Sequence, residues 1–240
     1  MADTLRGLEI LAAGGCGGLG SATVGILAAE GARVVSSYRS NRERAAALAD
    51  VATLVEADIT APDGRARLLD ACPKLYGLAV FAGDPARVTA DSPLEDALER
   101  SHRVNYLGPI LLAREAAARM RAAGAAGSIV LVSTMQAVSL FVNSTAYAGA
   151  KAALLHAARI LAKECRGPSG IRVNVICPGV NAAGMAASSI AAGKYDRYLA
   201  DGVIPRFGSP LDVARAVRFF LEPDNYITGQ VLTVDGGLTL

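Results

Sequence analysis

Short apolar runs alternate with helical patterns along the whole chain. Runs rich in Val, Ile, Leu and Ala predict buried strands, and longer Ala- and Leu-rich stretches predict helices. The predicted strands are 8–13, 32–38, 53–57, 78–82, 129–132, 171–177 and 230–234. The predicted helices are 21–30, 41–49, 63–71, 93–123, 145–166 and 212–221. Strands that alternate with helices predict a parallel sheet with helices on both faces.

This alternation continues without a repeat, a linker or a low-complexity segment. We therefore expect residues 1–240 to form a single α/β domain, a Rossmann-like doubly wound parallel sheet. Within it, Asp63 is expected to cap the helix 63–71, and Pro93 to open the long helix 93–123. The segment 184–202 has weak periodicity and is the predicted substrate lid, with a mixture of residues that favours a modest, mainly apolar substrate.

Composition excludes several classes of partner. The net charge is only +2, which gives no electrostatic basis for binding nucleic acid or a membrane surface. No signal-peptide pattern or membrane-spanning apolar stretch is found, so we expect no membrane association. The four cysteines lack metal-ligand spacing, so no metal site is predicted, and a reduced, cytoplasmic protein is expected.

A glycine-rich turn, GGCGGLG, follows the first predicted strand. In a dinucleotide-binding fold, Gly14 would permit the tight turn, Gly18 would let the backbone approach a pyrophosphate, and Gly20 would let the helix pack closely. Leu19 lies at the start of that helix, whose N-terminus attracts phosphate. We place all four residues in a dinucleotide site. The alternative is a glycine-rich turn without a ligand.

The end of the second predicted strand indicates which dinucleotide binds. A carboxylate there would accept the ribose hydroxyls of NAD, but this chain has Tyr38, followed by Arg39 and Ser40. An arginine can pair with the 2′-phosphate of NADP, so NADP is preferred over NAD, although Gly17 adds no second basic group. The alternative is that Arg39 and Arg42 are ordinary solvated charges at a helix start.

Tyr147 and Lys151 are four residues apart on a predicted helix and therefore share one face. A phenol has a pKa of about 10. A nearby ammonium favours the phenolate and is expected to lower that pKa towards neutrality, which suits a general acid/base. The spacing alone is equally typical of a solvated helix face carrying a half-buried tyrosine.

Taken together, the motifs resemble those of the classical short-chain dehydrogenase/reductase family over essentially the whole chain. They occur in the order of that family and are far more specific together than singly. The matching pieces are Gly14-x3-Gly18-x-Gly20, Asp58-Ile59, Ala82-Gly83, Asn105 in RVNYLGP, Tyr147-x3-Lys151, IRVNVICPG and YITGQVLTVDGG.

The resemblance implies a nicotinamide dinucleotide and the interconversion of an alcohol and a carbonyl. It makes Tyr147 the acid/base, Lys151 the ligand of the nicotinamide ribose, and Asn105 the holder of a water in the proton relay. It also implies a homotetramer, with the helices 93–123 and 145–166 at one interface and residues 238–240 near another. The remaining dinucleotide-binding positions that it suggests are Asp58, Ile59, Ala82, Gly83, Pro178, Gly179 and Val180.

Some positions depart from the family pattern. Thr134 stands where the family usually has serine; its hydroxyl can still orient a carbonyl, and Ser133 is the alternative. Ala13 and the pair Val80-Phe81 lack side-chain hydrogen bonds that usually join neighbouring turns. Ala183 replaces a threonine that commonly holds the nicotinamide carboxamide, and Asn181 is a possible substitute.

The leading hypothesis is an NADP-preferring enzyme that interconverts a small-molecule secondary alcohol and a ketone by hydride transfer. One alternative is a 3-oxoacyl-carrier-protein reductase, although the uncharged stretch 122–128 offers an acidic carrier protein no basic surface. The alternative from another class is a non-catalytic dinucleotide-binding scaffold. Ala183 and Val80-Phe81 favour the scaffold, whereas the presence of Asn105, Tyr147 and Lys151 disfavours it.

Overall fold

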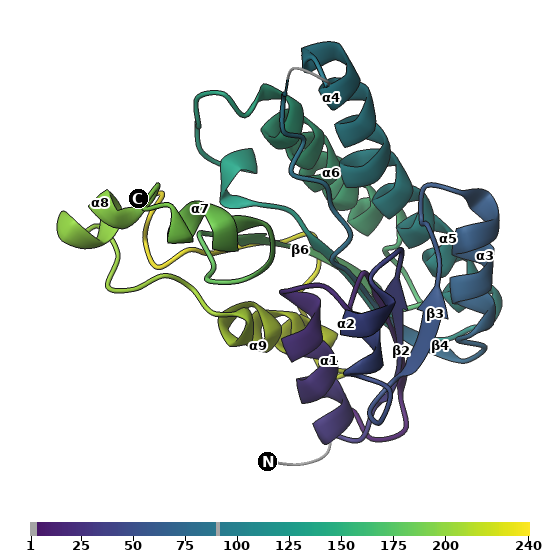
Figure 1. Cartoon of the computed structure of the whole chain (residues 1–240). Helices are drawn as coiled ribbons and strands as arrows, with labels where there is room; N and C mark the ends of the chain where they lie inside the picture. The colour runs from purple at the N-terminus through teal and green to yellow at the C-terminus, as the bar shows by residue number, and fades with distance from the viewer. Residues whose placement is uncertain (1–3, 90–91) are drawn as a thin grey trace.

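Seven parallel strands form one sheet in the order β3-β2-β1-β4-β5-β6-β7. The computed structural model describes residues 4–89 and 92–240 (Figure 1). The order reverses between β1 and β4, which is the arrangement of a doubly wound sheet, and the predicted fold class is confirmed. The strands are β1 (Glu9–Ala13), β2 (Arg33–Tyr38), β3 (Thr53–Glu56), β4 (Leu75–Val80), β5 (Gly127–Val132), β6 (Ile171–Pro178) and β7 (Val231–Val234).

Helices cover both faces of this sheet (Figure 1). They are α1 (Gly20–Ala29), α2 (Arg42–Ala46), α3 (Pro62–Asp70), α4 (Leu94–Ser101), α5 (Gly108–Ala122), α6 (Thr145–Glu164), α7 (Ala187–Ala191), α8 (Asp196–Ala200) and α9 (Pro210–Leu221). In the part of the chain that the structure describes, no helix combines the length and apolar character needed to cross a bilayer.

The alternation of side chains along each strand divides the core into two layers. Leu11 and Leu131 pack in one layer with the buried faces of α3, α5 and α6. Their neighbours Ile10 and Val130 point the other way and pack with α1 and α9. Because both faces of the strands are buried, their sequences are almost continuously apolar, as in other parallel sheets.

Three helix boundaries differ from the prediction. The long helix 93–123 is divided into α4 and α5 by a π-helical turn, His102–Leu107, and Pro93 is the N-cap residue of α4. Asp63 does not cap α3. Ala61 occupies the N-cap position, Pro62 follows it, and Asp63 instead lies in the first turn, 3.8 Å from Arg67. The predicted helix 41–49 is regular only over α2.

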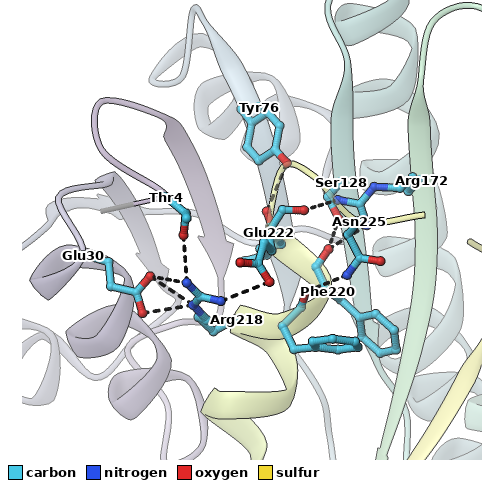
Figure 2. Close-up of polar contacts among 11 residues, drawn as sticks. Thr4, Glu30, Tyr76, Ser128, Arg172, Arg218, Phe220, Glu222 and Asn225 are labelled. Atoms are coloured by element: carbon cyan, nitrogen blue, oxygen red, sulfur yellow. Dashed lines mark hydrogen bonds and ion pairs between the residues drawn. The ribbon is translucent and has the colours of Figure 1, made fainter. Parts of the chain in front are cut away.

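The C-terminal end of α9 is held by side chains from the amino ends of three strands (Figure 2). Arg172 of β6 donates to the carbonyls of Phe220 and Glu222 at 2.9 and 2.7 Å. Ser128 of β5 also donates to Phe220, at 2.7 Å, and Tyr76 of β4 donates to the carbonyl of the residue between them at 3.0 Å. The last carbonyls of a helix have no partners within it, so these side chains satisfy them.

Arg218, on α9 itself, extends the same network towards α1 (Figure 2). Its Nη2 lies 2.9 Å from a carboxylate oxygen of Glu30 and donates to Thr4 Oγ1 at 2.8 Å. Its Nη1 lies 3.3 Å from Glu222. The amino edge of the sheet is therefore closed by polar groups that contact one another.

Candidate active site

A cavity of about 500 Å³ opens at the carboxyl edge of the sheet, opposite the network of Arg172. This is the edge at which doubly wound folds bind their ligands, near the reversal of strand order. The predicted site residues that line it are Gly14, Gly18, Leu19, Gly20, Tyr38, Arg39, Ser40, Asp58, Ile59, Ala82, Gly83, Thr134, Tyr147, Pro178 and Gly179. The structure thus brings together residues from six strand ends.

The glycine turn is as tight as predicted, but the atoms that approach its glycines differ in part from those expected from the sequence. Gly14 has a φ of 74°, and a Cβ there would come within 2.8 Å of the Ala82 backbone nitrogen. A Cβ on Gly20 would come within 2.6 Å of Gly15 Cα, so this glycine permits packing within the turn itself. A Cβ on Gly18 would come within 2.5 Å of the Gly184 nitrogen, at the start of the predicted lid. The absence of a side chain at Gly18 therefore lets the backbone of the predicted lid approach closely.

One end of the cavity carries exposed positive charge. Arg39 and Arg44 are exposed, and both line the cavity, whereas Arg42 does not. Arg44 was missed in the sequence because helix α2 was expected to start earlier. The Asn41 side chain accepts from the Arg44 backbone at 2.8 Å and sets the first turn, which brings position 44 to the cavity.

The turn after β3 forms the neighbouring wall. An Asp58 carboxylate oxygen accepts from the Thr60 nitrogen at 2.8 Å, which fixes the turn. Behind it, the buried Arg65 donates to the Ile59 carbonyl at 3.0 Å and to Glu115 at 3.0 Å. Sequence patterns did not reveal this role of Arg65, because its partner on α5 is distant in the chain.

Thr134 and Tyr147 form the other end of the cavity. Both side chains line the cavity, and the Thr134 side chain lies near enough to the Tyr147 hydroxyl to lower the pKa of that phenol. The Ser133 hydroxyl instead donates to the Lys151 carbonyl at 2.9 Å, inside the protein. The alternation of side chains at the end of β5 separates these neighbours, and Thr134 is the one whose hydroxyl lies on the side of the phenol.

Lys151 lies behind the cavity wall rather than in it. Its side chain is 2% exposed, and Nζ donates to the Val132 carbonyl at 2.8 Å. A Cβ on Gly83 would lie 3.6 Å from Nζ, so the ammonium is separated from the cavity by little more than that glycine. Burial disfavours the charged form and lowers the pKa of Lys151 to about 8.

The expected lowering of the Tyr147 pKa is not found in this structure. Burial raises the pKa of Tyr147 to about 12, against a smaller lowering by the hydrogen bond from Thr134. Desolvation therefore sets the direction of the shift, and the charge of Lys151, which the spacing suggested, is not among its causes. A phenol of this kind is protonated at neutral pH and can act as an acid without prior ionisation.

Asn105 is fully buried beside Gly83, within the π-helical turn. Its Oδ1 accepts from the Asp84 nitrogen at 2.9 Å, and its Nδ2 donates to the Asp84 carbonyl and to Ser101 Oγ, both at 2.9 Å. The side-chain donors are thus used to hold the turn after β4. Asn105, like Lys151, lies outside the cavity lining.

Known proteins resemble this chain in sequence and in fold. Residues 14–239 fit a family model described as enoyl-(acyl carrier protein) reductase. The chain belongs to the short-chain dehydrogenase/reductase family. The family relationship covers nearly the whole chain, and it makes the protein an oxidoreductase that uses a nicotinamide dinucleotide.

Two curated relatives and one solved structure illustrate the similarity. The chloroplastic NADPH-dependent aldehyde reductase 2 of Arabidopsis thaliana is 30% identical, over 98% of this chain and 95% of its own. The 3-oxoacyl-[acyl-carrier-protein] reductase of Rattus norvegicus is 33% identical, over 95% and 96%. The structure of a short-chain type dehydrogenase/reductase from Mycobacterium ulcerans has a TM-score of 0.89 and 29% identity, over 98% of this chain and 90% of that one.

The lining of this short-chain dehydrogenase/reductase cavity fits such a dinucleotide. The glycines of the turn line the cavity and leave room for a pyrophosphate beside the protein backbone, and the arginines can pair with phosphate at the adenosine end. A bound dinucleotide supplies the hydride, and the chain supplies a phenol and a hydroxyl at the other end. Val180, predicted to touch the ligand, is 6% exposed and is absent from the cavity lining. Its neighbour Asn181 and the lid residue Met185 do line the cavity.

Proposed function

We propose that the protein is an NADP-preferring enzyme that interconverts a secondary alcohol and a ketone. The observation that carries this proposal is that Tyr147 and Thr134 line the cavity together, with the Thr134 side chain near enough to lower the pKa of the Tyr147 phenol. In ketone reduction, the Tyr147 hydroxyl gives its proton to the substrate oxygen as hydride reaches the carbonyl carbon. Thr134 orients that oxygen by hydrogen bonding.

Lys151 and Asn105 lie outside the cavity lining, and we assign each of them a supporting role. The ammonium of Lys151 approaches the cavity beside Gly83 and would contact the ribose next to the nicotinamide. It also favours the developing phenolate. The side-chain donors of Asn105 are taken by Asp84 and Ser101, so we assign the proposed water contact to its main-chain carbonyl.

The preference for NADP rests on charge at the adenosine end. Arg39 and Arg44 line the cavity, and Tyr38 offers no carboxylate to accept two ribose hydroxyls or to repel a phosphate. The similar Arabidopsis protein is named NADPH-dependent, which agrees with this assignment.

A turnover assay tests the activity directly. The purified protein is incubated with NADPH or NADH and a panel of small ketones and aldehydes, and oxidation of the dinucleotide is followed by absorbance. We expect turnover that is faster with NADPH at limiting cofactor and strongly reduced in Tyr147→Phe. Binding of NADPH without turnover on any carbonyl would favour the scaffold alternative, and absence of binding would remove both.

A second candidate substrate is a 3-oxoacyl group carried by an acyl carrier protein, because the similar rat enzyme is named for that reaction. The two substrates are distinguished by comparing acetoacetyl carrier protein with the same acyl group on N-acetylcysteamine. A carrier-protein enzyme would show a much lower KM for the protein-bound form. Equal KM values favour the small-molecule substrate.

We further propose a homotetramer in a reducing, cytoplasmic compartment. Exposed apolar side chains lie on α4 and α6, the helices implicated by the family resemblance: Leu94, Leu98 and Ile160 are between 41% and 49% exposed. The four cysteines are buried and unbridged, which agrees with a reducing environment. Light scattering at micromolar concentration tests the assembly, and a monomer would contradict it.

A further inference from the structure

A buried arginine stands behind the turn that follows β3, residues 58–60. Arg65, on α3, is 5% exposed, and its Nη1 donates to the Ile59 carbonyl at 3.0 Å. Its Nε lies 3.0 and 3.1 Å from the two carboxylate oxygens of Glu115 on α5, the helix that lies beside α3 (Figure 1). The arginine therefore ties both helices to the turn 58–60.

The two helices also meet this turn through their glycines. A methyl group on Gly64 of α3 would come within 2.1 Å of the Asp58 carbonyl oxygen. A methyl group on Gly108 of α5 would come within 3.1 Å of the Ile59 carbonyl oxygen. Backbone from two helices thus packs directly against the turn, and the guanidinium of Arg65 adds a side-chain donor to the same carbonyl.

The opposite side of the turn faces the cavity. Residues 57–60 line it, as does Arg39. The turn follows β3, the outermost strand beside β2, so it lies at the adenosine end of the cavity and far along the sheet from β5. Ile59 gives this wall an apolar side chain, and Asp58 gives it a carboxylate. A flat base that carries an amino group can use both.

Stability alone gives a weak account of the buried ion pair. The Arg65 side chain is 6% exposed and that of Glu115 is 39% exposed, so the guanidinium loses most of its hydration. The cost of desolvation offsets much of the attraction in such a pair, and apolar residues of similar volume are often as stable. The pair therefore acts chiefly on position, because it fixes where the Ile59 carbonyl lies.

We propose that Arg65 is a positioning residue for the adenine ring of the dinucleotide: it holds the turn 58–60 in the shape that receives the ring, and Glu115 holds Arg65. This inference rests on the proposed function, which places the adenosine half at this end of the cavity. A turn that is held before binding does not have to be ordered by the ligand, so the affinity for adenine nucleotides is higher.

The test compares two arginines on α3. Arg65→Met keeps an unbranched side chain and removes the guanidinium. Arg67→Met is the matched control, because Arg67 is exposed and its ion pair with Asp63, at 3.8 Å, lies on the surface. Calorimetry gives the dissociation constant for 2′,5′-ADP, which represents the adenosine half alone. We expect about tenfold weaker binding to Arg65→Met and native affinity in Arg67→Met. In the turnover assay, the KM for NADPH should rise by the same factor in Arg65→Met, with kcat unchanged.

The double variant Arg65→Met/Glu115→Met separates position from stability. It replaces the ion pair by apolar side chains, so urea unfolding should show a recovery of the stability that Arg65→Met loses. The Ile59 carbonyl still lacks its donor, so 2′,5′-ADP should bind as weakly as it does to Arg65→Met. The double variant also serves as the test protein if Arg65→Met alone does not fold.

Native affinity for 2′,5′-ADP in Arg65→Met, or its return in the double variant, would overturn the proposal and reduce the ion pair to a structural contact. Either result leaves the proposed function intact. If the native protein bound neither 2′,5′-ADP nor NADPH, the proposed function would fail together with this inference.

Discussion

Polar side chains are paired with protein partners at the amino edge of the sheet, but are desolvated or unpaired at the carboxyl edge. At the amino edge, Arg172, Ser128 and Tyr76 donate to the terminal carbonyls of α9, and their polar atoms have protein partners. At the carboxyl edge, Tyr147 is half-buried and Lys151 is buried, and desolvation disfavours the charged form of each, raising the pKa of Tyr147 and lowering that of Lys151. Asn181 Oδ1, on the same edge, has no partner.

This difference separates stability from function within one domain. The network at the amino edge satisfies the helix end, and its loss leaves buried carbonyls unpaired. The groups at the carboxyl edge are positioned for a ligand, so they lower the stability of the protein on its own. Substitutions at the two edges should therefore change different measured quantities.

The largest effect is expected from Tyr147→Phe at the carboxyl edge. The variant keeps the ring and loses the hydroxyl that passes the proton, so turnover should fall by about 10² to 10⁴. Because the hydroxyl is desolvated, the free energy of unfolding should hardly change. Steady-state kinetics and urea unfolding measure the two quantities. Near-normal turnover would remove Tyr147 from its proposed role.

Arg172→Met should have the opposite profile. Removing the guanidinium leaves the Glu222 carbonyl without this donor, and the free energy of unfolding should fall by about 2–3 kcal/mol. Turnover per folded molecule should be unchanged. Arg215→Met, on the exposed side of α9, is the control and should shift stability by less than about 0.5 kcal/mol. A large loss of turnover in Arg172→Met would break the separation between the edges.

The neighbouring hydroxyls of Ser133 and Thr134, just after β5, allow an effect on stability to be compared with an effect on turnover. Thr134→Ala removes the cavity-lining hydroxyl near Tyr147, and turnover should fall by roughly ten- to a hundredfold. Ser133→Ala loses a bond to the Lys151 carbonyl, so it should cost about 1 kcal/mol of stability with a smaller effect on turnover. Thr134→Ser should be tolerated. If Ser133→Ala lowered turnover more than Thr134→Ala, Ser133 would be the residue that orients the substrate oxygen.

The buried ammonium predicts a pH dependence of stability. The folded-state pKa of Lys151, about 8, lies below its ordinary value of 10.5, so the unfolded chain binds more protons between these values. The contribution of Lys151 to stability should therefore rise as the pH increases from 8 towards 10.5, whereas buried thiols with raised pKa values, such as Cys72 and Cys177, act in the opposite sense above pH 9. Lys151→Met should remove the lysine contribution and gain roughly 1–2 kcal/mol at pH 7, while turnover falls. Urea unfolding monitored by circular dichroism at several pH values measures the stability of both proteins; an advantage of the variant over the native protein that does not shrink between pH 8 and pH 10.5 would contradict the prediction.

Cofactor choice should show the smallest effect. Arg39→Ala removes one charge-assisted contact to a 2′-phosphate, and NADPH binding should weaken by about tenfold while NADH binding is unchanged. Tyr38→Asp should shift the preference towards NADH, because a carboxylate accepts ribose hydroxyls and repels phosphate. Arg42→Ala serves as the control outside the cavity lining. Tighter binding of NADH than NADPH by the native protein would overturn the assignment.

The sequence by itself determined the fold class and most of the site. The period of apolar residues identified the strands, because a strand buried on both faces must be apolar throughout. The glycine turn and the spacing of Tyr147 and Lys151 are local patterns, and each lies within one strand–helix junction. Residues that lie at the carboxyl ends of parallel strands meet at one edge, so their order in the chain was enough to bring them together.

Tertiary structure alone decided the environment of those residues. The pKa of Tyr147 is set chiefly by desolvation, and not by the lysine that the spacing suggested. The division of α4 from α5 at Asn105, the place of Arg44 in the cavity and the unpaired oxygen of Asn181 depend on contacts made in three dimensions. Arg172 and its carbonyl partners are about fifty residues apart in the chain, so no local pattern could reveal their contact. Burial and hydrogen-bond pairing are properties of the packed molecule, because each depends on what the rest of the chain places around a group.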